Sequence, residues 1–168
     1  MRIVLIGMPG SGKTIKGEAL GEKLGLRFLD TDEIIVEKLK MSIAEVFDKF
    51  GEKYFRDAES EVAKNLEFID KTVISTGGGI IMRPENMEYL CKNSLTVFLH
   101  RDPEAILSDI DTDSRPLLRE NYRESFLNLY AARLPLYRKY CNIELDSSVE
   151  IEESVEKIAE AYLKGACL

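Results

Sequence analysis

"RIVLIGMPGSGKT", residues 2–14, places three structural signals in a row. The continuous apolar run at residues 3–6 is typical of a strand that is covered on both faces. Residues 7–14 match the pattern G-x-x-x-x-G-K-[ST], and an amphipathic helical pattern follows directly. Because a strand precedes the glycine-rich loop and a helix follows it, this stretch predicts a P-loop.

A P-loop at this position predicts binding of a nucleoside triphosphate. Its glycines let successive N–H groups turn toward the phosphates, and the start of the helix adds positive potential. We expect Gly10, Ser11 and Gly12 to surround the phosphates. Lys13 would place its charge on the β- and γ-phosphates, and Thr14 would offer its hydroxyl to Mg²⁺. The motif carries no information about the phosphate acceptor.

The rest of the chain alternates short apolar runs with helical patterns. Further strands are predicted at residues 26–30, 72–75, 94–99 and 142–145. Helices are predicted at residues 15–24, 33–39, 42–50, 55–66, 105–110 and 122–140, with an interruption or kink at Pro135. A last helix would open with a capping box formed by Ser147 and Glu150. This alternation indicates an α/β fold with a parallel sheet, in a single domain that spans residues 1–168.

The composition excludes several classes of protein. The chain has 168 residues, 45% of them apolar, and a net charge of −7, which argues against a nucleic-acid partner. No apolar run approaches the roughly 18 residues of a membrane span. The three cysteines are odd in number and lack a metal-binding spacing, so neither disulfides nor zinc are expected. We expect a cytoplasmic monomer without a membrane or nucleic-acid partner.

Two acidic residues follow the predicted second strand, in "LDTDE". Residues two apart in an extended segment share a face, so Asp30 and Asp32 could both point into one cleft beside the P-loop. Phosphoryl transfer to a hydroxyl needs one group that orients or deprotonates this hydroxyl, and an acidic partner for Mg²⁺. The alternative is a solvated turn in which Asp32 caps the following helix.

Arginines and a glycine triplet complete the candidate site. Arg56, Arg115 and Arg133 could each be an ordinary surface ion-pair partner, but arginine is also the residue that binds carboxylates and phosphates through two parallel bonds. The triplet Gly77, Gly78 and Gly79 directly follows a predicted strand. Because glycine costs conformational entropy, three in a row suggest that another group must approach the backbone closely there.

These motifs together resemble those of the shikimate kinases, from one end of the chain to the other. The resemblance rests on "GMPGSGKT", "FLDTDEII", "EKYFRDAE", "VISTGGGII", "SRPLL" and "ARLPLYRK". It implies the fold of the P-loop proteins that are similar to nucleoside-monophosphate kinases, with five parallel strands in the order 2-3-1-4-5 and helices on both faces. It also implies transfer of the γ-phosphate of ATP to the 3-hydroxyl of shikimate, which yields ADP, with Mg²⁺ as cofactor.

The resemblance assigns a role to each candidate residue. Lys13 and Thr14 would hold phosphate and Mg²⁺, with Asp30 as an outer partner of the metal. Asp32 would bind the acceptor hydroxyls and act as the base. Arg56 and Arg133 would bind the shikimate carboxylate, and Gly77, Gly78 and Gly79 would lie against its ring. Helices within residues 31–66 would surround the acceptor. Arg115 would lie in a mobile lid at residues 109–120 and would reach the transferred phosphate.

Two other functions remain open at this point. Gluconate kinases are similar in size and have a P-loop, but the two arginines and the glycine triplet fit shikimate better. A nucleotide-dependent binding switch without a chemical acceptor would need neither the acid pair nor these arginines. The chain also departs from many shikimate kinases, because it has no lysine or arginine between Asp102 and Ser114 that could stack on the base. We therefore expect weak discrimination between ATP and GTP, unless Arg101 or the loop after residue 145 replaces this contact.

Overall fold

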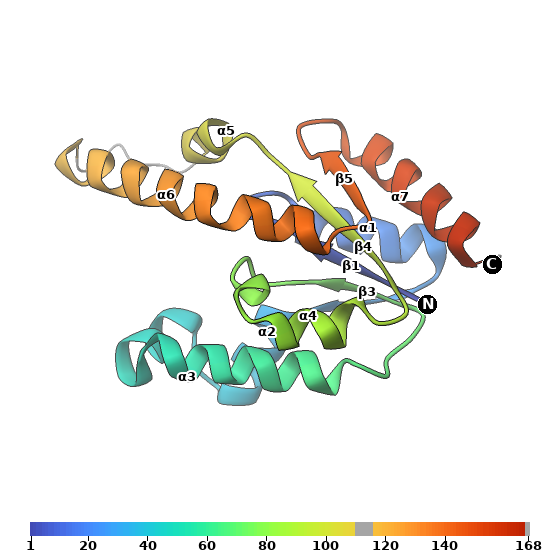
Figure 1. Ribbon diagram of the computed structural model, residues 1–168, viewed down its shortest axis with the longest axis horizontal. Helices are drawn as coiled ribbons and strands as arrows, with labels where there is room; N and C mark the ends of the chain where they lie inside the picture. Colours follow the sequence, from blue (N-terminus) through green and yellow to red (C-terminus); the bar gives the residue numbers. More distant parts are fainter. Residues whose placement is uncertain (110–115, 167–168) are drawn as a thin grey trace.

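A five-stranded parallel sheet forms the middle layer of the structure, a computed structural model that describes residues 1–109 and 116–166 (Figure 1). The strands are β1 (Arg2–Ile6), β2 (Arg27–Asp30), β3 (Thr72–Ser75), β4 (Ser94–His100) and β5 (Ile143–Asp146). They are ordered β2-β3-β1-β4-β5, and each neighbouring pair is parallel. The predicted α/β fold and its strand order are therefore confirmed.

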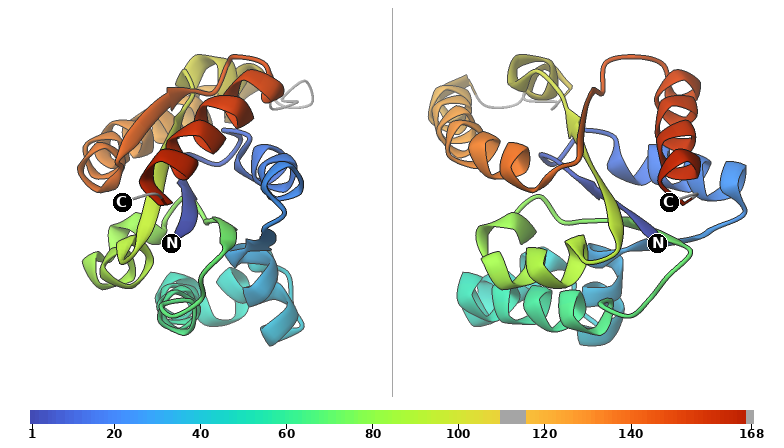
Figure 2. Two further views of the ribbon diagram at one scale, coloured as in Figure 1. Left: turned by 90° about the vertical axis from the view of Figure 1, so that its right-hand side faces the viewer. Right: turned by 45° about the vertical axis from the view of Figure 1, so that its right-hand side comes forward.

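Helices cover both faces of this sheet (Figure 2). They are α1 (Lys13–Leu24), α2 (Thr31–Leu39), α3 (Ile43–Asn65), α4 (Pro84–Cys91), α5 (Pro103–Ser108), α6 (Pro116–Tyr140) and α7 (Ile151–Ala166), with a 3₁₀ helix η1 (Ile80–Met82). Val4 and Ile6 of β1 pack toward α3, α4 and α6, whereas Ile3 and Leu5 pack toward α1 and α7. β1 is central and buried on both faces, which agrees with the continuous apolar run at its residues 3–6. Among the described helices, none is long and apolar enough to cross a membrane.

Several helices differ from the sequence prediction. The two helices expected between residues 42 and 66 join into α3, which is broken locally at Gly51 (φ 79°, ψ 171°). Helix α6 begins at Pro116, well before Tyr122, and continues through Pro135 without interruption. Helix α4 has no counterpart among the predicted helices, because its 8 residues give too short an apolar pattern.

The predicted capping box at the start of α7 is wrong. The Ser147 hydroxyl donates to the backbone carbonyl of Ser11 in the P-loop, and α7 begins only at Ile151. The side chain of Lys16 holds this loop against α1, because its Nζ donates to the carbonyls of Ser147 (2.9 Å) and Val149 (3.2 Å). The loop between β5 and α7 is thus fixed to the phosphate-binding end of α1.

Arg2 anchors the helices that carry the acceptor side of the site. Its side chain is buried, and its guanidinium donates to the carbonyls of Leu66 (2.6 Å) and Lys92 (3.0 Å), at the ends of α3 and α4. Carbonyls at a helix C-terminus have no partner within the helix, so a buried cation is a stabilising partner for them. The contact fixes the C-terminal end of α3 relative to β1.

Candidate active site

The P-loop connects β1 to α1 at the carboxyl end of the sheet, where open α/β folds bind their ligands. Gly10 (φ 79°) and Gly12 (φ 80°) adopt left-handed backbone angles that other residues rarely reach. The Nζ of Lys13 is buried and donates to the carbonyls of Gly7 (3.0 Å) and Met8 (2.8 Å). Burial lowers the pKa of Lys13 to about 8, although Asp32 and Asp30 oppose this shift. The Lys13 side chain is therefore bound to the P-loop, in a site where burial disfavours its charged form.

A cavity of about 310 Å³ lies beside the P-loop and contains both predicted acids. Thr14 Oγ1 donates to Asp30 Oδ2 (3.0 Å), so the hydroxyl and the carboxylate proposed for Mg²⁺ are adjacent. The described residues contain no cluster of three or more His, Cys, Asp or Glu side chains that could hold a metal. Mg²⁺ often binds through only one or two carboxylates, with water and substrate phosphates as its other ligands. The pair of Thr14 and Asp30 fits this kind of site.

Asp32 lines the same cavity, but it does so from the first turn of α2 and not, as the spacing argument assumed, from an extended segment shared with Asp30. Asp30, not Asp32, caps α2, because its Oδ1 accepts from the Asp32 N–H (2.9 Å). Burial raises the pKa of Asp32, and the charge of Asp30 adds to this effect, whereas Lys13 and Arg56 oppose it. Asp32 Oδ1 is buried and has no hydrogen-bond partner within the described part of the chain. A buried polar atom without a partner is uncommon in proteins and is consistent with a functional role of this carboxylate.

Protein side chains approach each glycine of the triplet closely. A Cβ atom on Gly77 would collide with the Asp32 carboxylate, one on Gly78 would lie 2.6 Å from Pro9 Cδ, and one on Gly79 would collide with the Arg56 guanidinium. The φ angles of all three lie outside the left-handed region, so the requirement for glycine here is one of space. The close approach inferred from the sequence is present, and in this structure the approaching groups are the side chains of the site itself.

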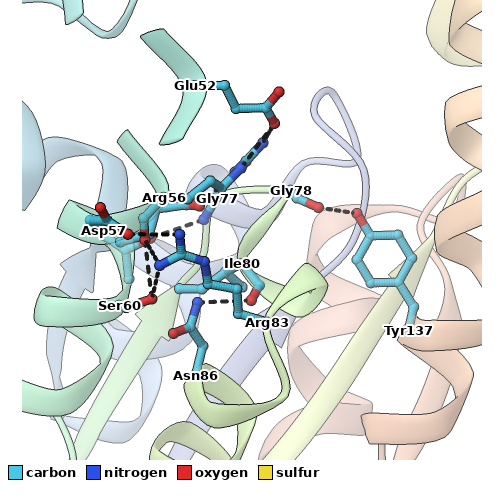
Figure 3. Close-up of polar contacts among 12 residues, drawn as sticks. Glu52, Arg56, Asp57, Ser60, Gly77, Gly78, Ile80, Arg83, Asn86 and Tyr137 are labelled. Carbon is cyan, nitrogen blue, oxygen red and sulfur yellow. Dashed lines mark hydrogen bonds and ion pairs between the residues drawn. The ribbon is translucent and has the colours of Figure 1, made fainter. Parts of the chain in front are cut away.

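Arg56, on α3, contacts two carboxylates. Its Nη1 lies 2.5 Å from Glu59 Oε2, and its Nη2 lies 3.1 Å from Glu52 Oε1, the contact drawn in Figure 3. Glu59 is almost fully buried, and burial raises its pKa, against the opposing effects of Arg56. Glu59 Oε1 has no hydrogen-bond partner among the described residues. The charge of Arg56 is thus held at the edge of the glycine triplet.

Arg83 supports α3 at this position. Its Nη1 donates to the Arg56 carbonyl (3.0 Å) and the Ser60 hydroxyl (3.0 Å), and its Nη2 lies 2.7 Å from Asp57 Oδ1 (Figure 3). Arg83 follows η1 and therefore links the segment after the triplet to the helix turn that carries Arg56. This contact fixes the spacing between the triplet and α3.

Arg133 lies on α6, and its charge acts on the pKa of both Lys13 and Glu59. It is 7% exposed, and its Nε is buried without a hydrogen-bond partner in the described residues. One helical turn later, Tyr137 donates its hydroxyl to the Gly78 carbonyl (2.6 Å; Figure 3). Burial raises the pKa of Tyr137 to about 12, despite the nearby charge of Arg133, so the hydroxyl stays protonated and keeps donating. Helix α6 therefore both presents an arginine and holds the triplet in place.

The structure thus brings most of the predicted residues together. It also adds Glu59, Arg83 and Tyr137, which the sequence analysis did not assign to the site. The spacing of three between Arg56 and Glu59 and of four between Arg133 and Tyr137 places each pair on one helix face and could have indicated two of them. Arg115 lies outside the described residues, together with the rest of residues 110–115 of the predicted lid. Residues 116–120, which were also assigned to this lid, instead form the start of α6.

The structure also bears on which residue could contact the base of the nucleotide. Ser108 Oγ donates to the Ala105 carbonyl of its own helix (2.8 Å). Arg101 donates to the Gly10 carbonyl (2.9 Å) and forms an ion pair with Asp109 (2.5 Å). Arg101, the replacement suggested by the sequence, is therefore engaged with the P-loop and with the end of α5.

Comparison with known proteins gives the same family as the motifs. A family model described as shikimate kinase matches residues 9–163. A shikimate kinase of Clostridium botulinum (strain Eklund 17B / Type B) is 43% identical over 98% of both chains, and one of Thermodesulfovibrio yellowstonii is 41% identical over 95% of this chain and 94% of its own. The solved shikimate kinase from Acinetobacter baumannii in complex with shikimate superimposes with a TM-score of 0.88 at 34% identity, covering 98% of this chain and 93% of that one. The Aquifex aeolicus enzyme gives 0.85 at 37% identity over 100% and 99%. This chain belongs to the shikimate kinase family.

Proposed function

We propose that this protein transfers the γ-phosphate of ATP to the 3-hydroxyl of shikimate, which gives shikimate 3-phosphate and ADP. The observation that carries the proposal is that Asp32, Glu59 and Arg133 each have a buried polar atom without a partner in the described residues, namely Oδ1, Oε1 and Nε; Ser75 Oγ and Asn86 Oδ1 share this property. Buried polar atoms in proteins nearly always have partners, so these three indicate a polar ligand. An acid with several hydroxyls supplies acceptors and donors for all three.

In this proposal the acceptor is bound by charge at one end and by hydroxyl contacts at the other. Arg56 and Arg133 bind the shikimate carboxylate from α3 and α6, because two guanidinium groups favour a planar anion. The Asp32 carboxylate accepts hydrogen bonds from the ring hydroxyls. The triplet of Gly77, Gly78 and Gly79 leaves room for these side chains to converge beside the ring.

Phosphoryl transfer then forms a bond between the acceptor oxygen and Pγ, while the bond from Pγ to the β-phosphate oxygen breaks. The proton of the 3-hydroxyl passes to Asp32, whose raised pKa makes it a stronger base than an exposed aspartate. Lys13 turns from the carbonyls of Gly7 and Met8 toward the β- and γ-phosphates, where its charge stabilises the transition state. Positioning and electrostatics supply most of the catalysis in reactions of this type.

Mg²⁺ would be held by Thr14 with Asp30 as its outer partner, and it would neutralise charge on the phosphates when bound. Gly10, Ser11 and Gly12 would supply N–H groups to the same phosphates, and Arg115 would contact the transferred group. A cytoplasmic location and a monomeric state complete the proposal; gel filtration at the assay concentration tests the latter.

An assay of ADP release tests the proposed function. ADP production is measured with ATP and Mg²⁺, and with shikimate, gluconate or no acceptor. We expect ADP release that depends on shikimate. Release that depends on gluconate would favour the sugar-acid kinase, and release without an acceptor, or none at all, would favour the binding switch.

A further inference from the structure

The guanidinium that is proposed to bind the substrate carboxylate is already occupied in this structure. Glu52 Oε1 accepts from both Nε (3.2 Å) and Nη2 (3.1 Å) of Arg56. Glu59 Oε2 accepts from Nη1 (2.5 Å). The edge formed by Nε and Nη2 is one that an arginine offers to a carboxylate through two bonds. An incoming carboxylate can take this edge only after Glu52 leaves it.

The two glutamates differ in how easily they can move. Glu59 is 1% exposed and lies against Gly77, so it is a fixed part of the site. The Glu52 side chain is 67% exposed and directly follows Gly51, where the helical geometry of α3 is broken. The Arg56 side chain is only 15% exposed, but the Glu52 end of the pair faces solvent, so water solvates the released carboxylate well. Glu52 is therefore the partner that Arg56 can exchange.

We propose that Glu52 is a placeholder carboxylate, which occupies Arg56 in the free enzyme and competes with the carboxylate of the substrate. The proposal rests on the proposed function, because it assumes that Arg56 binds an acidic acceptor. In the absence of substrate, Glu52 keeps Arg56 paired and directed along α3. The ion pair also selects for acidic ligands. A ligand with a negative charge gives Arg56 a new ion-pair partner when Glu52 leaves, whereas a neutral ligand does not.

Glu52 has one other role that its position explains. It lies in the first turn after the break at Gly51, where an acidic residue interacts favourably with the start of the second helical segment. If this were the only role of Glu52, its replacement would change the stability of α3 and would either leave the affinity for shikimate unchanged or lower it. Removing a competitor has the opposite effect on affinity.

The substitution Glu52→Gln tests the proposal, because glutamine keeps the size of the side chain and removes its charge. Freed from competition, the variant should bind shikimate about two- to six-fold more tightly, which follows from the typical strength of an exposed pair. The change should fall on KM for shikimate more than on kcat. Glu61→Gln is a matched control, since Glu61 is also an exposed glutamate of α3 and pairs with Lys38, away from Arg56.

Two measurements separate the possible outcomes. Shikimate is titrated calorimetrically into wild type and both variants, and steady-state kinetics are then measured with shikimate and with an analogue whose carboxylate is replaced by a hydroxymethyl group. We expect Glu52→Gln to raise kcat/KM for shikimate and not for the neutral analogue. Unchanged or weaker binding of shikimate by Glu52→Gln, or equal effects on both acceptors, would overturn the proposal. If wild type itself does not bind shikimate, the proposed function fails instead.

Discussion

The substitution Gly78→Ala places a methyl group between the glycine triplet and the P-loop. The added Cβ would lie 2.6 Å from Pro9 Cδ, 3.1 Å from Pro9 Cγ and 3.2 Å from the Pro9 nitrogen. Carbon atoms normally rest about 3.5–4.0 Å apart, so the closest contact is short by about 1 Å. Tyr137 holds the Gly78 carbonyl at 2.6 Å, so the shift needed to relieve the collision strains that bond or moves the P-loop.

The magnitude follows from this overlap. Overpacking of a tight contact costs about 1–3 kcal/mol, and for a protein of this size each kcal/mol lowers Tm by about 2–4 °C. A misplacement of about 1 Å in an active site can reduce the rate about 10²-fold. Because Pro9 belongs to the P-loop, we expect kcat/KM to fall at least tenfold for ATP as well as for shikimate, by this same estimate.

The assay is steady-state kinetics with each substrate varied in turn, accompanied by thermal unfolding. Gly165→Ala is the matched control, since its Cβ would lie 3.3 Å from the flexible end of Met1. This control should keep wild-type kinetics. If Gly78→Ala keeps kcat and both KM values within about twofold of wild type, the spatial account of the triplet is wrong.

Three further predictions concern the charged groups. Asp32→Asn should retain ATP binding and lose about 10²–10⁴-fold in kcat, as single-turnover kinetics would show; more than about a third of wild-type turnover would contradict its role as base. Arg133→Ala should raise KM for shikimate at least about tenfold with little change in KM for ATP, because it removes a charged hydrogen bond; equal rises would place Arg133 on the nucleotide or in the fold. The ligand-free pKa of Lys13 is about 8, so Lys13 loses its charge as the pH rises through that value, and kcat/KM for ATP should fall above it. Bound phosphates raise this pKa, so kcat should stay level to higher pH, and a kcat/KM profile that stays flat well above pH 8 would contradict the prediction.

The fold was largely predictable because its determinants are local in the sequence. The apolar run of β1, the glycines of the P-loop and the acids after β2 each lie within a few residues of one another, so spacing alone indicates their geometry. Where the prediction failed, tertiary contacts overrode a local pattern. The local pattern predicts that Ser147 caps a helix, but its hydroxyl donates to the carbonyl of Ser11, which is far away in the sequence.

The sequence indicated candidate residues for the site, but it did not indicate how these residues contact one another. No spacing indicates that Arg83 reaches the Arg56 carbonyl, since 27 positions separate the two residues. The contacts of Gly77 and Gly79 likewise depend on how α2 and α3 pack against the triplet. Such contacts follow from packing among distant elements, which a single sequence does not encode in any short pattern.

The most direct test of the central claim is to identify the product. The protein is incubated with ATP, Mg²⁺ and shikimate, and the position of the phosphate is determined by coupled ³¹P and ¹H NMR. Our account predicts shikimate phosphorylated on the 3-hydroxyl, with ADP formed in equal amount. A phosphate on another hydroxyl, or ADP accompanied only by inorganic phosphate, would contradict it.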